Sequence, residues 1–132
     1  MTTRKMFQDK QSGNWWLRVQ NSDLGYWPSS IFTRLSDRAD IITWGAEIVN
    51  LELQGRHTST QMGSGHFPSE GFSKASFFRN LEYIDDSGAV KDAENLVPYV
   101  TKPSCYDLQL GNVNKFGTHF FFGGPGYSDK CQ

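Results

Sequence analysis

The segment that most constrains the fold is residues 41–50, which read Ile-Ile-Thr-Trp-Gly-Ala-Glu-Ile-Val-Asn. β-Branched and aromatic side chains dominate this segment and predict a central strand. Alternate side chains of a strand point to opposite faces. The core face then carries Ile42, Trp44, Ala46 and Ile48, and the opposite face carries Thr43, Gly45, Glu47 and Val49.

Glu47 is the unusual member of the second face. A carboxylate within an apolar strand is costly to bury, so its face must be solvated, paired or functional. Gly45 lies on the same face and leaves room beside Glu47 for another backbone. Glu47 is therefore a candidate for the floor of a cleft. The alternative is an ordinary surface glutamate on the solvated face of an antiparallel sheet.

The bulk composition excludes two classes of function. The 132 residues suit a single domain with a modest core. A net charge of −1, with 13 basic and 14 acidic residues spread along the chain, gives no basic stripe for nucleic acid. The chain also lacks the run of about 18 apolar residues that a membrane span needs.

Short strands separated by turns predict an all-β fold, an antiparallel β-sandwich. Apolar residues on both sides of residues 73–84 indicate a strand between two covering layers. A single short helix is predicted at residues 28–35, because Pro28 suits a first turn and Ile31, Phe32 and Leu35 share a face. The other strands are predicted at residues 15–20, 24–27, 105–110 and 118–122.

Other chemical groups give weaker signals. Glu70 is a second candidate acid, although a glutamate in a turn is usually just solvated. The histidines, His57, His66 and His119, lack metal-ligand spacing, so neither a metal nor a cofactor is expected. Alternation turns one ring of each aromatic pair, at residues 15–16 and 26–27, away from the core, where it would suit a sugar or peptide ligand.

The two cysteines leave the redox compartment open. In an oxidising compartment Cys105 and Cys131 could form a disulfide worth about 3–4 kcal/mol. The alternative is a pair of reduced structural thiols, and the cysteine count does not choose between them. The first ten residues contain no apolar stretch, so the sequence predicts no signal peptide in this chain.

A series of motifs runs through the chain in a fixed order. They are Gly13-Asn14-Trp15-Trp16-Leu17, Gly25-Tyr26-Trp27-Pro28-Ser29-Ser30-Ile31-Phe32, Trp44-Gly45-Ala46-Glu47-Ile48, His57-Thr58-Ser59-Thr60-Gln61-Met62-Gly63-Ser64-Gly65, Phe77-Phe78-Arg79-Asn80, Cys105-Tyr106-Asp107 and Gly123-Gly124-Pro125-Gly126. From about residue 7 to the end, this series resembles the C-terminal half of plant neprosin domains.

The resemblance implies a secreted glutamic endopeptidase that cuts peptides near proline and is built as a β-sandwich. Two glutamates on its concave face form the catalytic pair, and the Trp-Gly-x-Glu match places one of them at Glu47. The matched cysteines favour a disulfide between Cys105 and Cys131. Ala46 replaces a second glycine of the family, and since it is predicted to point into the core, the change should matter little. With a peptide substrate and no cofactor, the candidates for the substrate cleft are Gly45, Tyr26, Trp27 and Gln61.

Two neighbouring carboxyl groups do not both ionise easily, so such a pair holds one proton in acid. The ionised group draws a proton from the attacking water, and the protonated group polarises the scissile carbonyl and later protonates the leaving nitrogen.

In the family the partner glutamate lies in the N-terminal half of the domain, before the motif at residues 13–17. We therefore expect residues 1–6 to be the start of a truncated chain, residues 7–132 to be the C-terminal part of a neprosin domain, and the chain to be inactive as encoded. The alternative function is a non-catalytic β-sandwich module that binds cell-wall polysaccharide or peptide through exposed aromatic rings.

Overall fold

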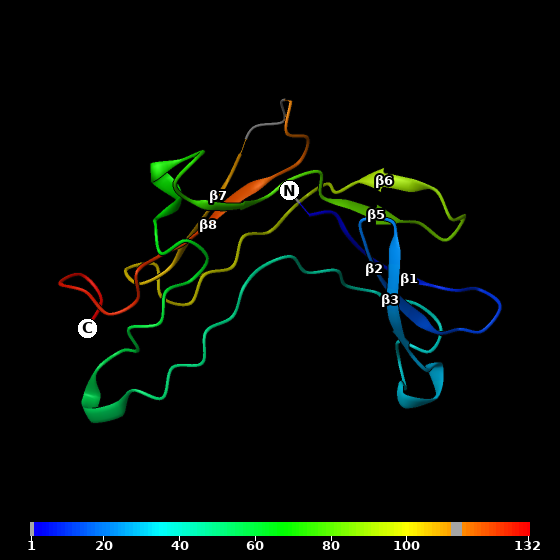
Figure 1. Ribbon diagram of the computed structural model, residues 1–132, viewed down its shortest axis with the longest axis horizontal. Coiled ribbons are helices and arrows are strands. Elements are labelled where there is room, and N and C mark those ends of the chain that lie inside the picture. The colour runs from blue at the N-terminus through cyan, green and yellow to red at the C-terminus, as the bar shows by residue number, and fades with distance from the viewer. Residues whose placement is uncertain (1, 112–114) are drawn as a thin grey trace. The chain divides into compact units, whose positions relative to one another are not determined.

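The computed structural model describes residues 2–111 and 115–132 (Figure 1). The chain divides into two compact units, Met1–Thr43 and Trp44–Gln132, and each is described by itself. All strand pairs between named strands are antiparallel, and the helices in the described residues are three-residue 3₁₀ turns. The predicted all-β antiparallel class is confirmed, and none of these turns is a helix that could span a membrane.

The first unit is a three-stranded sheet of order β1-β2-β3. Its strands are β1 (Arg4–Gln8), β2 (Trp15–Val19) and β3 (Ser22–Trp27). The β1–β2 turn contains Gly13 at φ 71°, a left-handed conformation that suits glycine. The Asp9 carboxylate accepts hydrogen bonds from the backbone N–H and the hydroxyl of Ser12, at 3.0 and 2.5 Å, and fixes the same turn.

The helix predicted at residues 28–35 is present only as the 3₁₀ turn η1 (Ser29–Ile31). Phe32 returns to an extended conformation, with φ −106° and ψ 147°, and ends the turn. The apolar spacing of residues 31, 32 and 35 does not produce a longer helix, because side chains of β2 and its preceding turn hydrogen-bond to the backbone of this segment. The Trp15 indole N–H donates to the Leu35 carbonyl at 2.6 Å, and the Asn14 side chain accepts from the Ser29 N–H at 3.0 Å.

The second unit contains a three-stranded sheet of order β4-β8-β7 and a two-stranded hairpin, β5-β6. The strands are β4 (Ser76–Phe78), β5 (Glu82–Ile84), β6 (Val90–Asp92), β7 (Asp107–Leu110) and β8 (Phe120–Gly123). The remaining 3₁₀ turns are η2 (Leu53–Gly55) and η3 (Pro68–Glu70). The continuous strand predicted at residues 73–84 is wrong, because Asn80 takes φ 50° and separates β4 from β5.

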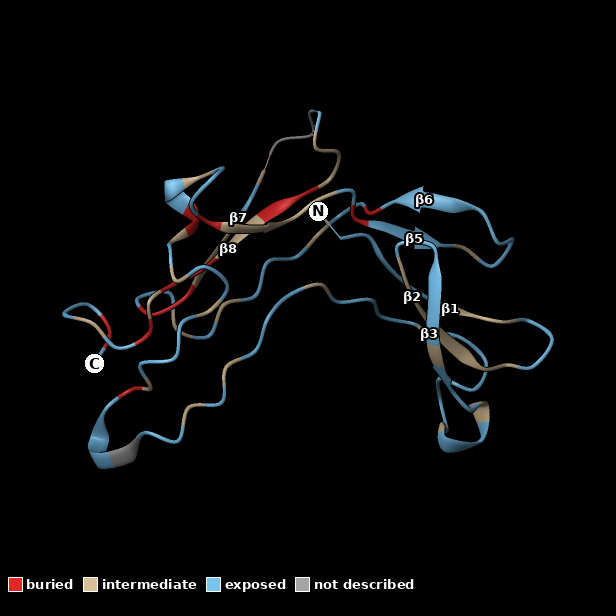
Figure 2. Cartoon of the chain, in the orientation of Figure 1, coloured by how far each residue is buried: buried red, intermediate tan, exposed pale blue. Residues whose placement is uncertain are grey.

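Aromatic rings cover both faces of the β4-β8-β7 sheet. On one face Phe78 stacks on Phe120 and Phe122, each at 5.2 Å between ring centroids, and these rings pack with buried Leu81 and Ala93. On the other face Phe77 meets Phe121 at 5.8 Å. The predicted apolar character of both sides of residues 76–78 is therefore confirmed. Within the described residues, every buried residue belongs to the second unit (Figure 2).

The central strand predicted at residues 41–50 is absent, and the segment is an extended coil (Figure 1). A strand needs a neighbour to complete its hydrogen-bond ladder, and no described segment pairs with this one. The predicted core face is half realised. Trp44 packs against the Leu81–Ala93–Phe120 cluster and Ile48 packs against the Cys105–Tyr106–Cys131 cluster, whereas Ile42 and Ala46 are exposed.

Candidate functional site

Glu47 lies in the extended coil between two anchored side chains of the second unit. Trp44 and Ile48 are partly buried against the two core clusters, while the Glu47 side chain is exposed. Among the described residues its carboxylate has no hydrogen-bond or ion-pair partner. The acid is thus held by its neighbours on a surface segment and is open to water and to a ligand.

Gly45 gives Glu47 an open flank. A Cβ built on Gly45 would meet no described atom within 4 Å. No described backbone therefore occupies the room that a glycine leaves at this point, and that room is accessible from solvent. An incoming peptide or a further strand has space beside the carboxylate.

Gln61 is exposed and directly precedes the isolated bridge between Met62 and Gly124. Its amide lies across Gly65, since a Cβ built on Gly65 would be 2.6 Å from Gln61 Cδ. Gly65 also takes φ 78°. The structure therefore brings Gln61 together with the Gly65 turn.

Glu70 is placed as a cap of the turn η3. Its carboxylate accepts from the Phe67 N–H at 3.2 Å and from His66 Nδ1 at 3.0 Å, and Lys74 Nζ lies at 3.7 Å. The hydrogen bond from His66, aided by the Phe67 N–H and the Lys74 charge, lowers the pKa of Glu70. These contacts hold Glu70 ionised and occupy its oxygens, which suits a structural cap better than a proton donor.

We expect Glu70→Gln to remove an acid-dependent part of the stability. Because the folded pKa of Glu70 is lowered, its contribution is present above the unfolded value of about 4.3 and is lost as the pH falls through the folded value. The difference in melting temperature between the wild type and Glu70→Gln should therefore shrink below about pH 4. Melting curves between pH 3 and 6 measure it, and a difference that stays constant over this range would contradict the assignment.

Tyr26 and Trp27 belong to β3 of the first unit, and Glu47 belongs to the second unit. Tyr26 is opposite Trp16 in the sheet, with ring centroids 4.8 Å apart, and Trp27 is opposite Trp15. Trp16 and Tyr26 therefore share one face of the β2–β3 hairpin, and Trp15 and Trp27 share the other. Tyr26 and Trp27 are 52% and 39% exposed and offer contact area to a ligand.

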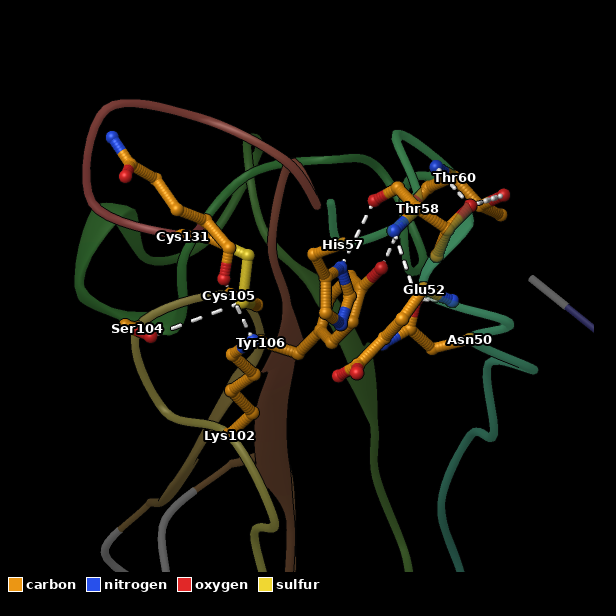
Figure 3. Close-up of a disulfide and its surroundings, with 11 residues drawn as sticks. Asn50, Glu52, His57, Thr58, Thr60, Lys102, Ser104, Cys105, Tyr106 and Cys131 are labelled. Atoms are coloured by element: carbon orange, nitrogen blue, oxygen red, sulfur yellow. Dashed lines mark hydrogen bonds between the residues drawn. A yellow bond between two sulfur atoms is a disulfide. The ribbon is translucent and has the colours of Figure 1, made fainter. Parts of the chain in front are cut away.

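A cluster of buried side chains surrounds the disulfide between Cys105 and Cys131 (Figure 3). The bond was one of two alternatives that the cysteine count left open, and its presence confirms the pairing that the resemblance favoured. Buried His57 and Tyr106 lie beside it, with ring centroids 5.4 Å apart. The Tyr106 hydroxyl donates to the Thr60 carbonyl at 2.8 Å. Sequence reasoning missed this cluster because its members come from distant segments.

Replacing Tyr106 by phenylalanine should have two effects. The Thr60 carbonyl loses its hydroxyl donor, which should cost about 1 kcal/mol of unfolding free energy. Burial raises the pKa of Tyr106, so the wild type should also lose stability as the pH rises above about 10 and through the folded pKa, and the variant should lack this loss. Urea denaturation at pH 7 and pH 10.5 measures both effects, and equal alkaline losses in the two proteins would contradict the second.

A comparison with protein families identifies the family of this chain. A family model described as Neprosin matches residues 1–125, which is nearly the whole chain. The matched range includes Glu47, Gly45, Tyr26, Trp27 and Gln61.

Proposed function

Because the chain belongs to the neprosin family, we propose that it forms part of a glutamic endopeptidase that hydrolyses peptides near proline and that Glu47 is one of the two catalytic acids. The proposal rests on the position of the Glu47 side chain within the Trp44–Ile48 motif. The two ends of the motif are packed against the core clusters, and the carboxylate between them is exposed beside the open flank of Gly45. A residue held in this way can meet a substrate without reorganising the core.

The chemistry requires a second carboxyl group close to the first. With one proton shared between the two groups, the ionised carboxylate removes a proton from water as the water attacks the peptide carbonyl. The protonated group donates to the carbonyl oxygen and then to the leaving nitrogen. Glu47 supplies one of these two groups, and no described carboxylate pairs with it. In the family that the chain resembles, the partner glutamate precedes the motif at residues 13–17, so we propose that the second acid lies outside these 132 residues and that the 132-residue chain alone is inactive.

Secretion belongs to the same proposal. Disulfides persist in oxidising compartments such as the cell exterior, and the Cys105–Cys131 bond is compatible with such a compartment. The bond joins residues 26 positions apart, and closing a loop of that length would stabilise the folded chain of a secreted peptidase.

The proposal is tested with the protein as its natural source produces it. The purified protein is incubated at pH 3–7 with proline-containing peptides, and the products are identified by mass spectrometry. We expect cleavage next to proline with an acid optimum. Loss of all cleavage in Glu47→Gln, with the far-ultraviolet spectrum unchanged, supports the assignment, and full cleavage by this variant would overturn it.

A second candidate function rests on the exposed rings of β3. Tyr26 and Trp27 present a partly exposed aromatic surface of the kind that stacks against sugar rings or peptide. A binding module of this kind should lose affinity for cell-wall polysaccharide or peptide in Trp27→Ala and keep it in Glu47→Gln. A peptidase should respond differently, since Glu47→Gln should abolish peptide turnover whatever its effect on peptide binding.

A further inference from the structure

Three buried residues of metal-binding type, His57, Cys105 and Cys131, lie together at the disulfide. One ring nitrogen of His57 and the Sγ atoms of Cys105 and Cys131 all lie within 4.8 Å of one another. His57 is 7% exposed and both cysteines are fully buried. In the oxidised protein the two sulfurs are bonded to each other and are therefore not available as thiolate ligands. Sequence spacing gives no sign of this group, because His57 is far from either cysteine along the chain.

His57 makes the kind of hydrogen bond that metal-binding histidines usually make. Nδ1 lies 3.0 Å from the Thr58 carbonyl oxygen, which has no proton to give, so Nδ1 carries the hydrogen and donates it. Nε2 then keeps its lone pair. A hydrogen bond from one ring nitrogen to a backbone carbonyl is the common outer-sphere arrangement that fixes the tautomer and ring position of a ligating histidine.

One of the two sulfur atoms also has a polar neighbour. The Ser104 hydroxyl lies 3.8 Å from Cys105 Sγ, within reach for a hydrogen bond to sulfur (Figure 3). A hydroxyl donor next to a thiolate offsets part of the cost of burying its charge. Backbone hydrogen bonds also hold both cysteines in place: the Cys105 N–H donates to the Lys102 carbonyl, and the Cys131 N–H donates to the Ser128 carbonyl, each at 3.0 Å.

We propose that reduction of the Cys105–Cys131 bond converts this cluster into a zinc site with His57 and the two thiolates as ligands. A thiol reductant supplies two electrons and two protons, and it leaves as its own disulfide while both cysteines become thiols. Zinc then displaces the two thiol protons, which pass to solvent. The cluster therefore holds either a disulfide or a metal, and the redox state decides which.

The ligand set and its spacing favour zinc. Two thiolates and one imidazole are a ligand combination that binds Zn²⁺, at about 2.3 Å from sulfur and about 2.0 Å from nitrogen, with water in the fourth position. A tetrahedral ion at these distances needs its ligand atoms about 3.5–3.8 Å apart. The three atoms already lie within 4.8 Å of one another, so rotation of the two cysteine side chains apart is the main adjustment. Hard cations such as Mg²⁺ and Ca²⁺ prefer oxygen and would not compete. This inference does not rest on the peptidase proposal.

The test uses the 132-residue chain reduced with a phosphine, which ends as its oxide and leaves no competing thiol. Zinc is titrated against a chromophoric chelator, and Co²⁺ serves as a spectroscopic probe of thiolate ligation. We expect the reduced protein to bind one equivalent of zinc, to show a sulfur-to-cobalt charge-transfer band, and to melt at a higher temperature with zinc than without it. The oxidised protein should bind no zinc at this cluster.

His57→Gln keeps the size of the side chain and removes the ligand. It should weaken zinc binding at least about 100-fold, since changes to outer-sphere partners alone cost about 10–100-fold. The matched control is His119→Ala, which removes another buried histidine whose Nδ1 also donates to a backbone carbonyl, that of Gly117 at 2.7 Å, without belonging to the cysteine cluster. This control should bind zinc as the wild type does. Circular dichroism of the oxidised variants checks folding, and reduced His57→Gln that binds zinc as tightly as the wild type would overturn the proposal, as would a reduced wild type that binds no zinc.

Discussion

Glu47→Gln in the complete natural protein is expected to lower kcat for peptide hydrolysis by about 10²–10⁴-fold, the usual contribution of a positioned acid or base. Glutamine keeps the size of the side chain but neither accepts a proton from water nor donates one to a leaving nitrogen. Since Glu47 is exposed and has no described hydrogen-bond partner, the change should leave the folded structure intact. Residual turnover should also lose its acid optimum, because that optimum belongs to the pair of carboxyl groups.

The matched control is Glu52→Gln. Glu52 is another exposed carboxylate in the same stretch of coil, and among the described residues its Oε1 accepts a single hydrogen bond, 3.3 Å long, from the Asn50 amide. Its replacement should change kcat by less than about 2-fold, since nothing in the proposed mechanism uses it. Equal losses in the two variants would show that the loss reflects charge on this segment rather than a catalytic role of Glu47.

Phe120→Ala is expected to be the most destabilising single substitution in the second unit. Phe120 is 3% exposed, and its ring contacts Phe78 and Phe122 at centroid distances of 5.2 and 5.8 Å. Removing a buried phenylalanine ring leaves a cavity and typically costs about 3–5 kcal/mol. Because small domains are stable by only about 5–15 kcal/mol, this loss should bring the unit close to unfolding at ordinary temperature.

Urea denaturation measures the effect as a lower midpoint with an unchanged slope. Phe72→Ala is the control, because Phe72 is 58% exposed although its ring also contacts Phe77 and Phe116. It should cost less than about 1.5 kcal/mol, mainly through lost ring–ring contacts. A Phe120→Ala midpoint equal to that of Phe72→Ala would contradict the assignment of the core to the Phe120 face of the sheet.

The local sequence pattern was sufficient to predict strands that pair with a neighbour close in the sequence. The strands predicted near residues 15–20 and 24–27 are found as β2 and β3, because a short turn joins them and alternation sets their register. The strands predicted at residues 105–110 and 118–122 correspond to β7 and β8. β1 was missed, since Arg4, Lys5 and Gln8 give it little apolar alternation, and its pairing with β2 depends mainly on the backbone.

The sequence pattern failed to predict the structure where strand formation depends on a partner that is distant in the sequence. Residues 41–50 have the composition of a strand, but a composition does not supply the neighbouring strand that completes a ladder. The packing of Trp44 and Ile48 followed the predicted face, whereas Ile42 and Ala46 did not. At the candidate site, Glu47 is exposed, which is one of the three settings that the sequence left open for its face, and its catalytic role stays a prediction.

Peptide hydrolysis by the oxidised 132-residue chain at acid pH, with folding confirmed by near-ultraviolet circular dichroism, tests the two-acid proposal most directly. Glu47 is proposed as one acid of a pair whose second member these residues do not contain, so the folded chain should cleave proline-containing peptides no faster than buffer does. Cleavage by this chain that disappears in Glu47→Gln would show that both acids lie within it and would contradict the proposed position of the second acid.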